Sequence, residues 1–232
     1  MNDMWIFLLA RKYALRIVLI FSLLIGIASF AYLNDYSKAD SEALAVLNDD
    51  RIVYEDKVYD YQTSADTALI FYPGGKVEAE AYAILLKGIQ DAGIRVFLVE
   101  MPFNLAVFDA NTAEKIIEDN PMIKHWYIGG HSLGGAMASQ FAEKHADRLD
   151  GLILLAAYPL NDAMDKVLLI AGSEDRVLDQ TKLEGFDVNW IEGGNHANFA
   201  HYGVQKGDGE ALIDKDEQIK MTQMWIIEFM NF

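Results

Sequence analysis

Short apolar runs and amphipathic segments alternate along most of this chain. Runs of three to six mostly apolar residues, too short for buried helices, predict strands. These runs lie at residues 67–72, 94–99, 126–128, 151–156, 166–170 and 188–191. Apolar residues between them recur every three or four positions, which predicts helices at residues 78–92, 113–119, 133–145 and 216–232. This alternation is typical of a mostly parallel sheet with helices on both faces.

The chain before this pattern behaves differently. Residues 51–61 alternate apolar and polar side chains, which predicts an edge strand or a hairpin. Residues 34–50 are polar and are expected to form a linker. The connection at residues 157–165 is nine residues long, too short to hold a separate cap domain. We therefore expect one open α/β domain over residues 51–232.

An uncharged apolar run at residues 17–33 precedes the linker. As a helix it spans about 25 Å, close to the thickness of bilayer hydrocarbon. Arg11, Lys12 and Arg16 come before it, and acidic residues follow from Asp35. This charge asymmetry predicts a single-pass anchor at residues 1–33, with a cytoplasmic amino terminus and an extracytoplasmic domain.

Two other interpretations of the apolar run stay open. One is a signal peptide cleaved near residues 29–31, where the small residues loosely match a cleavage site and the product would be secreted. The other is a buried core helix, which the length and the flanking charges disfavour.

Composition narrows the classes of function. The 232 residues include no cysteine, which excludes disulfides, thiolate metal sites and a cysteine nucleophile. The formal net charge is −16, and so acidic a protein is a poor partner for nucleic acid. His196 and His201 are a weak pair of metal ligands without a nearby third, so no metal or other cofactor is expected.

A G-x-S-x-G motif lies at residues 130–134, between a predicted strand and a predicted helix. In that setting the motif predicts a nucleophile elbow, a sharp turn that holds Ser132 above the edge of the sheet. The flanking glycines leave room where a Cβ would strike the neighbouring backbone. The alternative is a glycine-rich turn in which Ser132 merely caps the helix.

A serine hydroxyl needs a base to take its proton. His196 follows the strand at residues 188–191 and so lies at the carboxyl edge of the sheet, where Ser132 is also expected. His201 in the same loop is the second candidate. Asp175, after the strand at residues 166–170, is the expected orienting acid, with Glu174 as its alternative. Asp175 could also act as a helix cap.

Acyl transfer also needs two N–H donors for the developing negative charge. The amide of Leu133, just after the nucleophile, is one candidate. The second is expected from the loop after the strand at residues 67–72, where Gly75 is the first choice and Lys76 the next. Residues 101–105 are candidates for the wall of an acyl pocket or, equally, for core packing.

The motifs YPGG, GGHSLGG, AGSEDRV and GGNHANF together resemble those of the α/β-hydrolase superfamily. The resemblance covers residues 65–232 and is greatest to small members without a cap, of the dienelactone-hydrolase-like and carboxylesterase-like groups. It implies that Ser132 is the nucleophile, Asp175 the acid and His196 the base, with oxyanion donors from Gly75 and Leu133. Many members have His-Gly where this chain has Pro73-Gly74. The resemblance therefore implies an oxyanion hole but does not fix which amide of this loop is its second donor.

The expected function is a serine hydrolase that cleaves small-molecule carboxylic esters through an acyl-enzyme. The same triad would also serve amide, peptide or thioester cleavage, because fold and motif do not choose the bond. An inactive, tethered binding protein with this fold is the alternative from another class.

Overall fold

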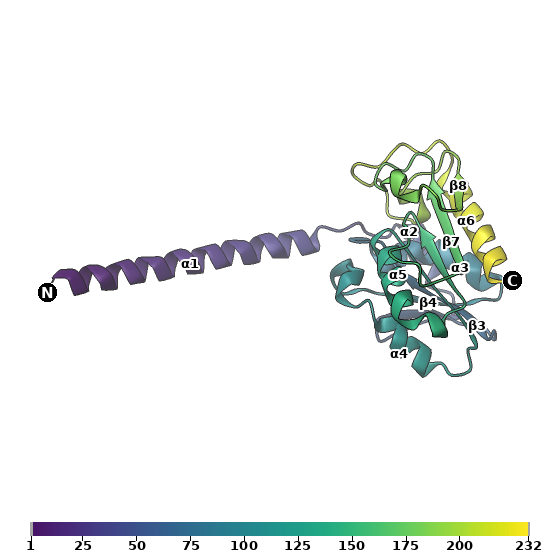
Figure 1. Ribbon diagram of the computed structural model, residues 1–232, viewed down its shortest axis with the longest axis horizontal. Helices are drawn as coiled ribbons and strands as arrows, with labels where there is room; N and C mark the ends of the chain where they lie inside the picture. Colours follow the sequence, from purple (N-terminus) through teal and green to yellow (C-terminus); the bar gives the residue numbers. More distant parts are fainter. Residues whose placement is uncertain (1, 232) are drawn as a thin grey trace. The chain divides into compact units, whose positions relative to one another are not determined.

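The computed structural model describes residues 2–231, which divide into two units between Tyr36 and Ser37. The first unit is helix α1 (Asn2–Asn34, purple in Figure 1). Its segment Arg11–Asn34 has a mean hydropathy of 2.3 and exposed apolar side chains. The predicted apolar helix is therefore confirmed, and it is long enough to cross a bilayer.

The second unit is built on an eight-stranded sheet, in the order β1-β2-β4-β3-β5-β6-β7-β8. The strands are β1 (Ile52–Glu55), β2 (Val58–Tyr61), β3 (Thr67–Tyr72), β4 (Arg95–Val99), β5 (His125–His131), β6 (Gly151–Leu155), β7 (Val167–Gly172) and β8 (Val188–Ile191). Strands β1 and β2 form the predicted hairpin and pair antiparallel. The other strands, β3 to β8 in the sequence, are parallel to one another.

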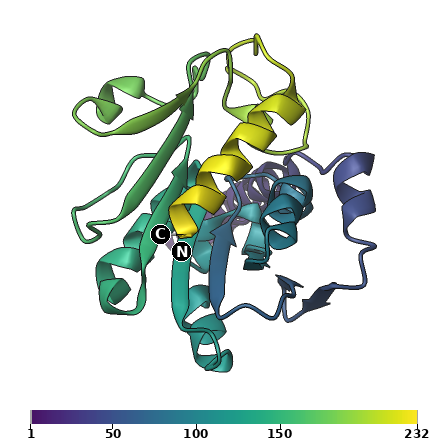
Figure 2. The same ribbon diagram turned by 90° about the vertical axis from the view of Figure 1, so that its right-hand side faces the viewer.

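Helices cover both faces of this sheet, as Figures 1 and 2 show. The helices are α2 (Ser41–Val46), α3 (Ala83–Asp91), α4 (Thr112–Asp119), α5 (Leu133–His145) and α6 (Lys215–Met230). One core lies under α3 and α6, and the other lies under α4 and α5. Helix α6 (yellow) lies beside α3, where Gln223 Nε2 donates a hydrogen bond of 3.0 Å to Ile84 O. The predicted α/β fold is confirmed.

The helix expected at residues 78–92 consists of two pieces. A 3₁₀ turn, Ala79–Tyr82, precedes α3, which ends before Gly93. Gly93 has a φ of +93°, the left-handed conformation in which glycine commonly stops a helix. Between β6 and β7 the chain forms neither helix nor strand, in keeping with the short connection.

The polar segment at residues 34–50 carries more structure than the expected linker. Asp40 caps α2 by accepting hydrogen bonds from the amides of Glu42 and Ala43 at 3.1 and 3.0 Å. Ala43 is fully buried, and α2 contacts α3. Ser37 forms a parallel bridge with Val77. From Ser37 onward the segment is therefore part of the folded unit.

Candidate active site

Ser132 lies at the turn from β5 into α5, as the motif predicts. Its backbone has φ 51° and ψ −119°, a strained conformation for a residue with a side chain. A Cβ on Gly134 would lie 2.2 Å from Tyr72 O, and one on Gly130 would lie 2.7 Å from the same atom. Both positions therefore require glycine, because α5 starts directly against the end of β3.

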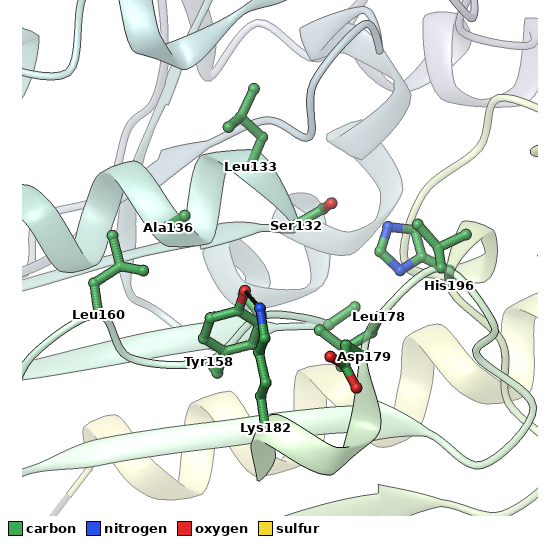
Figure 3. A pocket seen from close by; sticks show the side chains of 12 residues that line it. Ser132, Leu133, Ala136, Tyr158, Leu160, Leu178, Asp179, Lys182 and His196 are labelled. Carbon is green, nitrogen blue, oxygen red and sulfur yellow. Dashed lines mark hydrogen bonds between the residues drawn. The ribbon is translucent and has the colours of Figure 1, made fainter.

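The side chain of Ser132 does not cap the helix that it begins. Its amide donates a hydrogen bond of 2.9 Å to Leu155 O, which ties the turn to the end of β6. Figure 3 shows the hydroxyl pointing across a pocket toward the imidazole of His196. The capping interpretation of this serine is therefore wrong.

Asp175 and His196 form a buried pair beside Ser132. Asp175 Oδ2 lies 2.8 Å from His196 Nδ1, and both side chains are almost completely buried. A carboxylate can only accept, so His196 Nδ1 carries the hydrogen and donates it. In the neutral imidazole, Nε2 is then unprotonated and can act as a base.

The other oxygen of Asp175 fixes the orientation of the carboxylate. Oδ1 accepts hydrogen bonds from the amides of Val177 and Leu178 at 2.8 and 2.9 Å. The expected helix at this position is absent, and only a 3₁₀ turn, Gln180–Leu183, follows. Asp175 thus holds the turn at residues 175–178 with one carboxylate oxygen and orients His196 with the other.

The two alternatives for the acid and the base lie elsewhere. Ser173 Oγ lies 3.4 Å from Glu174 Oε1, whereas His196 pairs with Asp175. His201 Nδ1 lies 3.1 Å from Asp40 Oδ2 and lines a different cavity, near the start of α6. The structure therefore brings Ser132, Asp175 and His196 together and leaves Glu174 and His201 out.

The loop that carries His196 is held by Asp208, a residue that the sequence gave no reason to single out. Asp208 accepts hydrogen bonds from the amides of His196, Ala197 and Gly209, at 3.2, 2.9 and 2.8 Å. Asn195 Nδ2 adds a bond of 2.9 Å to Gly209 O. The bonds from the amides of His196 and Ala197 fix the backbone on both sides of the His196 Cα, and the bond from Gly209 orients the Asp208 carboxylate.

The oxyanion candidates Gly75 and Leu133 lie against each other, since a Cβ on Gly75 would lie 2.9 Å from the Leu133 side chain. The amides on either side of Gly75 are engaged. Gly74 N donates to Tyr82 Oη at 2.9 Å, and Lys76 N donates to Asn104 O at 2.7 Å. Gly75 N donates to no acceptor within residues 2–231. This favours Gly75 over Lys76 as the second donor.

A buried chain of hydrogen bonds supports this oxyanion loop, and the sequence did not reveal it. Tyr82 Oη accepts from Gly74 N and lies within hydrogen-bond distance of His131 Nδ1, at 2.7 Å. The His131 ring packs 4.5 Å from the ring of His196, centroid to centroid. Burial, and then the neighbouring His196, hold the pKa of His131 well below its usual value, so this imidazole is neutral.

A cavity of about 440 Å³ opens beside Ser132. Its wall combines apolar side chains, among them Ala136, Leu160 and Leu178, with the charged side chains of Asp179 and Lys182 (Figure 3). At one side Lys182 Nζ donates a hydrogen bond of 3.0 Å to Tyr158 Oη, and this bond raises the pKa of Lys182.

Residues 101–105 do not line this cavity. Met101 is buried in the core under α4 and α5, and Phe103 is exposed. Of the two interpretations of this segment, core packing holds for Met101. Within residues 2–231 no group of three acidic or histidine side chains is placed to hold a metal ion.

Fold, elbow and buried His–Asp pair together define a class of protein. Residues 68–220, well over half of the chain, match the family model described as "Alpha/beta hydrolase family". The chain belongs to the α/β-hydrolase family. No protein among those with curated descriptions matches it in sequence.

Solved structures share the fold at low identity. MGS-MChE2, an α/β hydrolase from a sediment metagenome of the Mar Chica lagoon in Morocco, has a TM-score of 0.58 at 14% identity, over 77% of this chain and 99% of its own. The monoacylglycerol lipase of Paleococcus ferrophilus has a TM-score of 0.58 at 13% identity, over 76% and 100%. Dienelactone hydrolase from Anabaena variabilis has a TM-score of 0.53 at 15% identity, over 77% and 94%.

Proposed function

We propose that this protein is a serine hydrolase that cleaves carboxylic esters through an acyl-enzyme on Ser132. The family is one of hydrolases, and its structural relatives include esterases and a lipase. The observation that carries the proposal is the arrangement around Ser132. A strained serine points its hydroxyl toward an imidazole whose far nitrogen is held by a buried carboxylate at 2.8 Å.

The chemistry follows from the proton positions. His196 Nε2 takes the proton of Ser132 as the hydroxyl attacks the ester carbonyl, and Asp175 stabilises the imidazolium that forms. The amides of Gly75 and Leu133 stabilise the oxyanion. His196 then gives its proton to the alcohol leaving group, and water attacks the acyl-enzyme by the reverse sequence of proton transfers. Neither cofactor nor metal takes part.

The test combines a covalent probe with turnover. Wild type is expected to react with a fluorophosphonate probe and to hydrolyse p-nitrophenyl acetate. Ser132→Ala is expected to lose both while it unfolds at the temperature of wild type. Ser64→Ala, an exposed serine before β3 at the opposite edge of the sheet, is the matched control and should keep both. Full labelling of Ser132→Ala would overturn the proposal.

We also propose that α1 anchors the protein, with the catalytic unit outside the cytoplasm. The length and hydropathy of Arg11–Asn34 support a span, and the basic residues before it support this orientation. In intact cells, added protease is expected to remove the catalytic unit from the membrane fraction. A catalytic unit that resists protease until the cells are lysed would contradict the orientation. A mature protein that begins after residue 31 would show cleavage instead.

A further inference from the structure

A patch of exposed apolar side chains lies on the loop after β4. Phe103 and Phe108 are each 58% exposed and Val107 is 50% exposed. The two phenyl rings meet edge to face, with their centroids 5.7 Å apart. No residue from 101 to 108 is charged, in a protein of net charge −16. A cluster of this kind marks a surface that contacts something apolar. We call Phe103, Val107 and Phe108 the aromatic patch.

The backbone under the patch is held in an unusual conformation. Phe103 and Asn104 have φ values of 56° and 54°, in the left-handed region that residues with side chains seldom occupy. Such strain persists only where the surroundings impose it, and it concentrates at functional segments. Met101 of the same loop is buried in the core. Phe103 is instead presented to the outside.

The patch adjoins the oxyanion loop of the candidate site. Asn104 O accepts the hydrogen bond from Lys76 N at 2.7 Å. The side chain of Leu105 would lie 3.7 Å from a Cβ on Gly75. The loop that bears the patch therefore contacts the loop that supplies an oxyanion donor.

The other side of the oxyanion loop is bonded to the first residue of the folded unit. Ser37 N donates to Lys76 O at 2.8 Å, and Glu78 N donates to Ser37 O at 3.0 Å. Only two residues separate Ser37 from Asn34, where the candidate span ends. Three residue steps of extended chain cover at most about 11 Å. If α1 crosses a bilayer, the oxyanion loop is thus confined near the surface of that bilayer.

We propose that the aromatic patch contacts the bilayer that holds α1 and admits membrane-resident acyl esters to Ser132. The inference rests on the proposed hydrolase and anchor functions, and it names the substrate class as esters of long acyl chains dissolved in the membrane. The bilayer is the occupant because the chain itself tethers the patch there. Shallow insertion of apolar side chains, without charge, suits an acidic domain that anionic lipid headgroups repel.

The contact is tested without reference to activity. Because the chain has no cysteine, Phe108→Cys carries a single environment-sensitive fluorophore. Met122→Cys is the matched control, since Met122 is 81% exposed but precedes β5 at the opposite edge of the sheet. Full-length protein is placed in phosphatidylcholine vesicles that contain a lipid-borne quencher. We expect quenching at position 108 and none at position 122. No quenching at position 108 would overturn the proposed contact with the bilayer, regardless of the hydrolytic activity of the protein.

Delivery of substrate is tested by comparing two esters. Phe103→Ser, Val107→Ser and Phe108→Ser are combined, with Met122→Ser as control. The triple variant is expected to lose about tenfold or more of its activity on p-nitrophenyl palmitate held in vesicles, because α1 still anchors it but the loop beside the oxyanion loop no longer inserts its apolar side chains into the bilayer. Its kcat/KM for soluble p-nitrophenyl acetate should match wild type. Equal activity on the vesicle ester would overturn delivery. Quenching at position 108 in a protein that hydrolyses neither ester would place the failure in the proposed hydrolase.

Discussion

Replacing Asp175 by asparagine separates its role in orienting His196 from its role in holding a loop. Oδ1 accepts two amide hydrogens at 2.8 and 2.9 Å, so the asparagine must keep its oxygen on that side. Its NH₂ group then faces His196 Nδ1 and donates to it. Nδ1 becomes the acceptor, Nε2 carries the hydrogen, and the imidazole can no longer take a proton from Ser132.

The expected loss is large in activity and small in stability. A wrong tautomer of this kind costs about 10⁴-fold in kcat. Because all three hydrogen bonds of the side chain are retained, the free energy of unfolding should change by less than about 1 kcal/mol. Asp175→Ala, in contrast, leaves the two amides and His196 without their acceptor. It should be less stable by about 1–3 kcal/mol, which lowers the melting temperature by several degrees in a domain of this size.

The assay is hydrolysis of p-nitrophenyl acetate, with thermal unfolding measured on the same preparations. Asp175→Asn is expected to melt with wild type and to be nearly inactive. If it retains more than about a tenth of wild-type kcat/KM, the tautomer argument is wrong. Glu174→Gln serves as the control, because its carboxylate does not contact His196, and its activity should be close to that of wild type.

Three further changes have expected outcomes. Gly134→Ala puts a Cβ 2.2 Å from Tyr72 O and 2.3 Å from Pro73 O. It should therefore displace α5 from β3, abolish labelling by the fluorophosphonate probe and lower the melting temperature sharply. Normal labelling would contradict this account of the elbow. His131 stays neutral in the folded protein while the unfolded chain takes up a proton below about pH 6.5, so the free energy of unfolding should fall with acid at about 1.4 kcal/mol per pH unit from this group. Urea titrations between pH 7.5 and 5.5 should show a shallower slope for His131→Gln, and an unchanged slope would assign the acid sensitivity to other groups. Leu154→Ala on the fully buried central strand β6 should cost about 2–5 kcal/mol in urea unfolding, and a cost below 1 kcal/mol would mean that the core around it collapses to fill the space.

Features that depend on neighbours in the chain were predictable from the sequence. The inner strands β3, β4, β6 and β7 are mostly apolar runs, and α5 begins at Leu133 within the G-x-S-x-G motif. The turn at Ser132 needs small residues on both sides, and the glycines that meet this need are close neighbours of Ser132 in the sequence. The carboxyl edge of the parallel sheet then places Asp175 and His196 with Ser132, because all three follow strands that point the same way.

Individual contacts between loops and side chains that the order of the strands does not dictate were not predictable. Nothing near His131 shows that its partner is Tyr82, 49 positions earlier. The hydrogen bond that engages Lys76 N comes from the loop of the aromatic patch, so only the folded chain distinguishes Lys76 from Gly75. The polar composition of residues 37–50 indicated a linker, because the burial of Ala43 and the bridge from Ser37 involve single residues and leave no periodic pattern.

The order of the strands decides how much of the chain the candidate site requires. Ser132 follows β5, whereas Asp175 follows β7 and His196 follows β8, so the three side chains come together only in a sheet that contains all of these strands. A nascent polypeptide that ends before Asp208 lacks the acceptor that holds the imidazole loop. The candidate site is therefore completed only by residues near the carboxyl end of the sequence, and any shorter chain lacks the bonds that hold His196 in place.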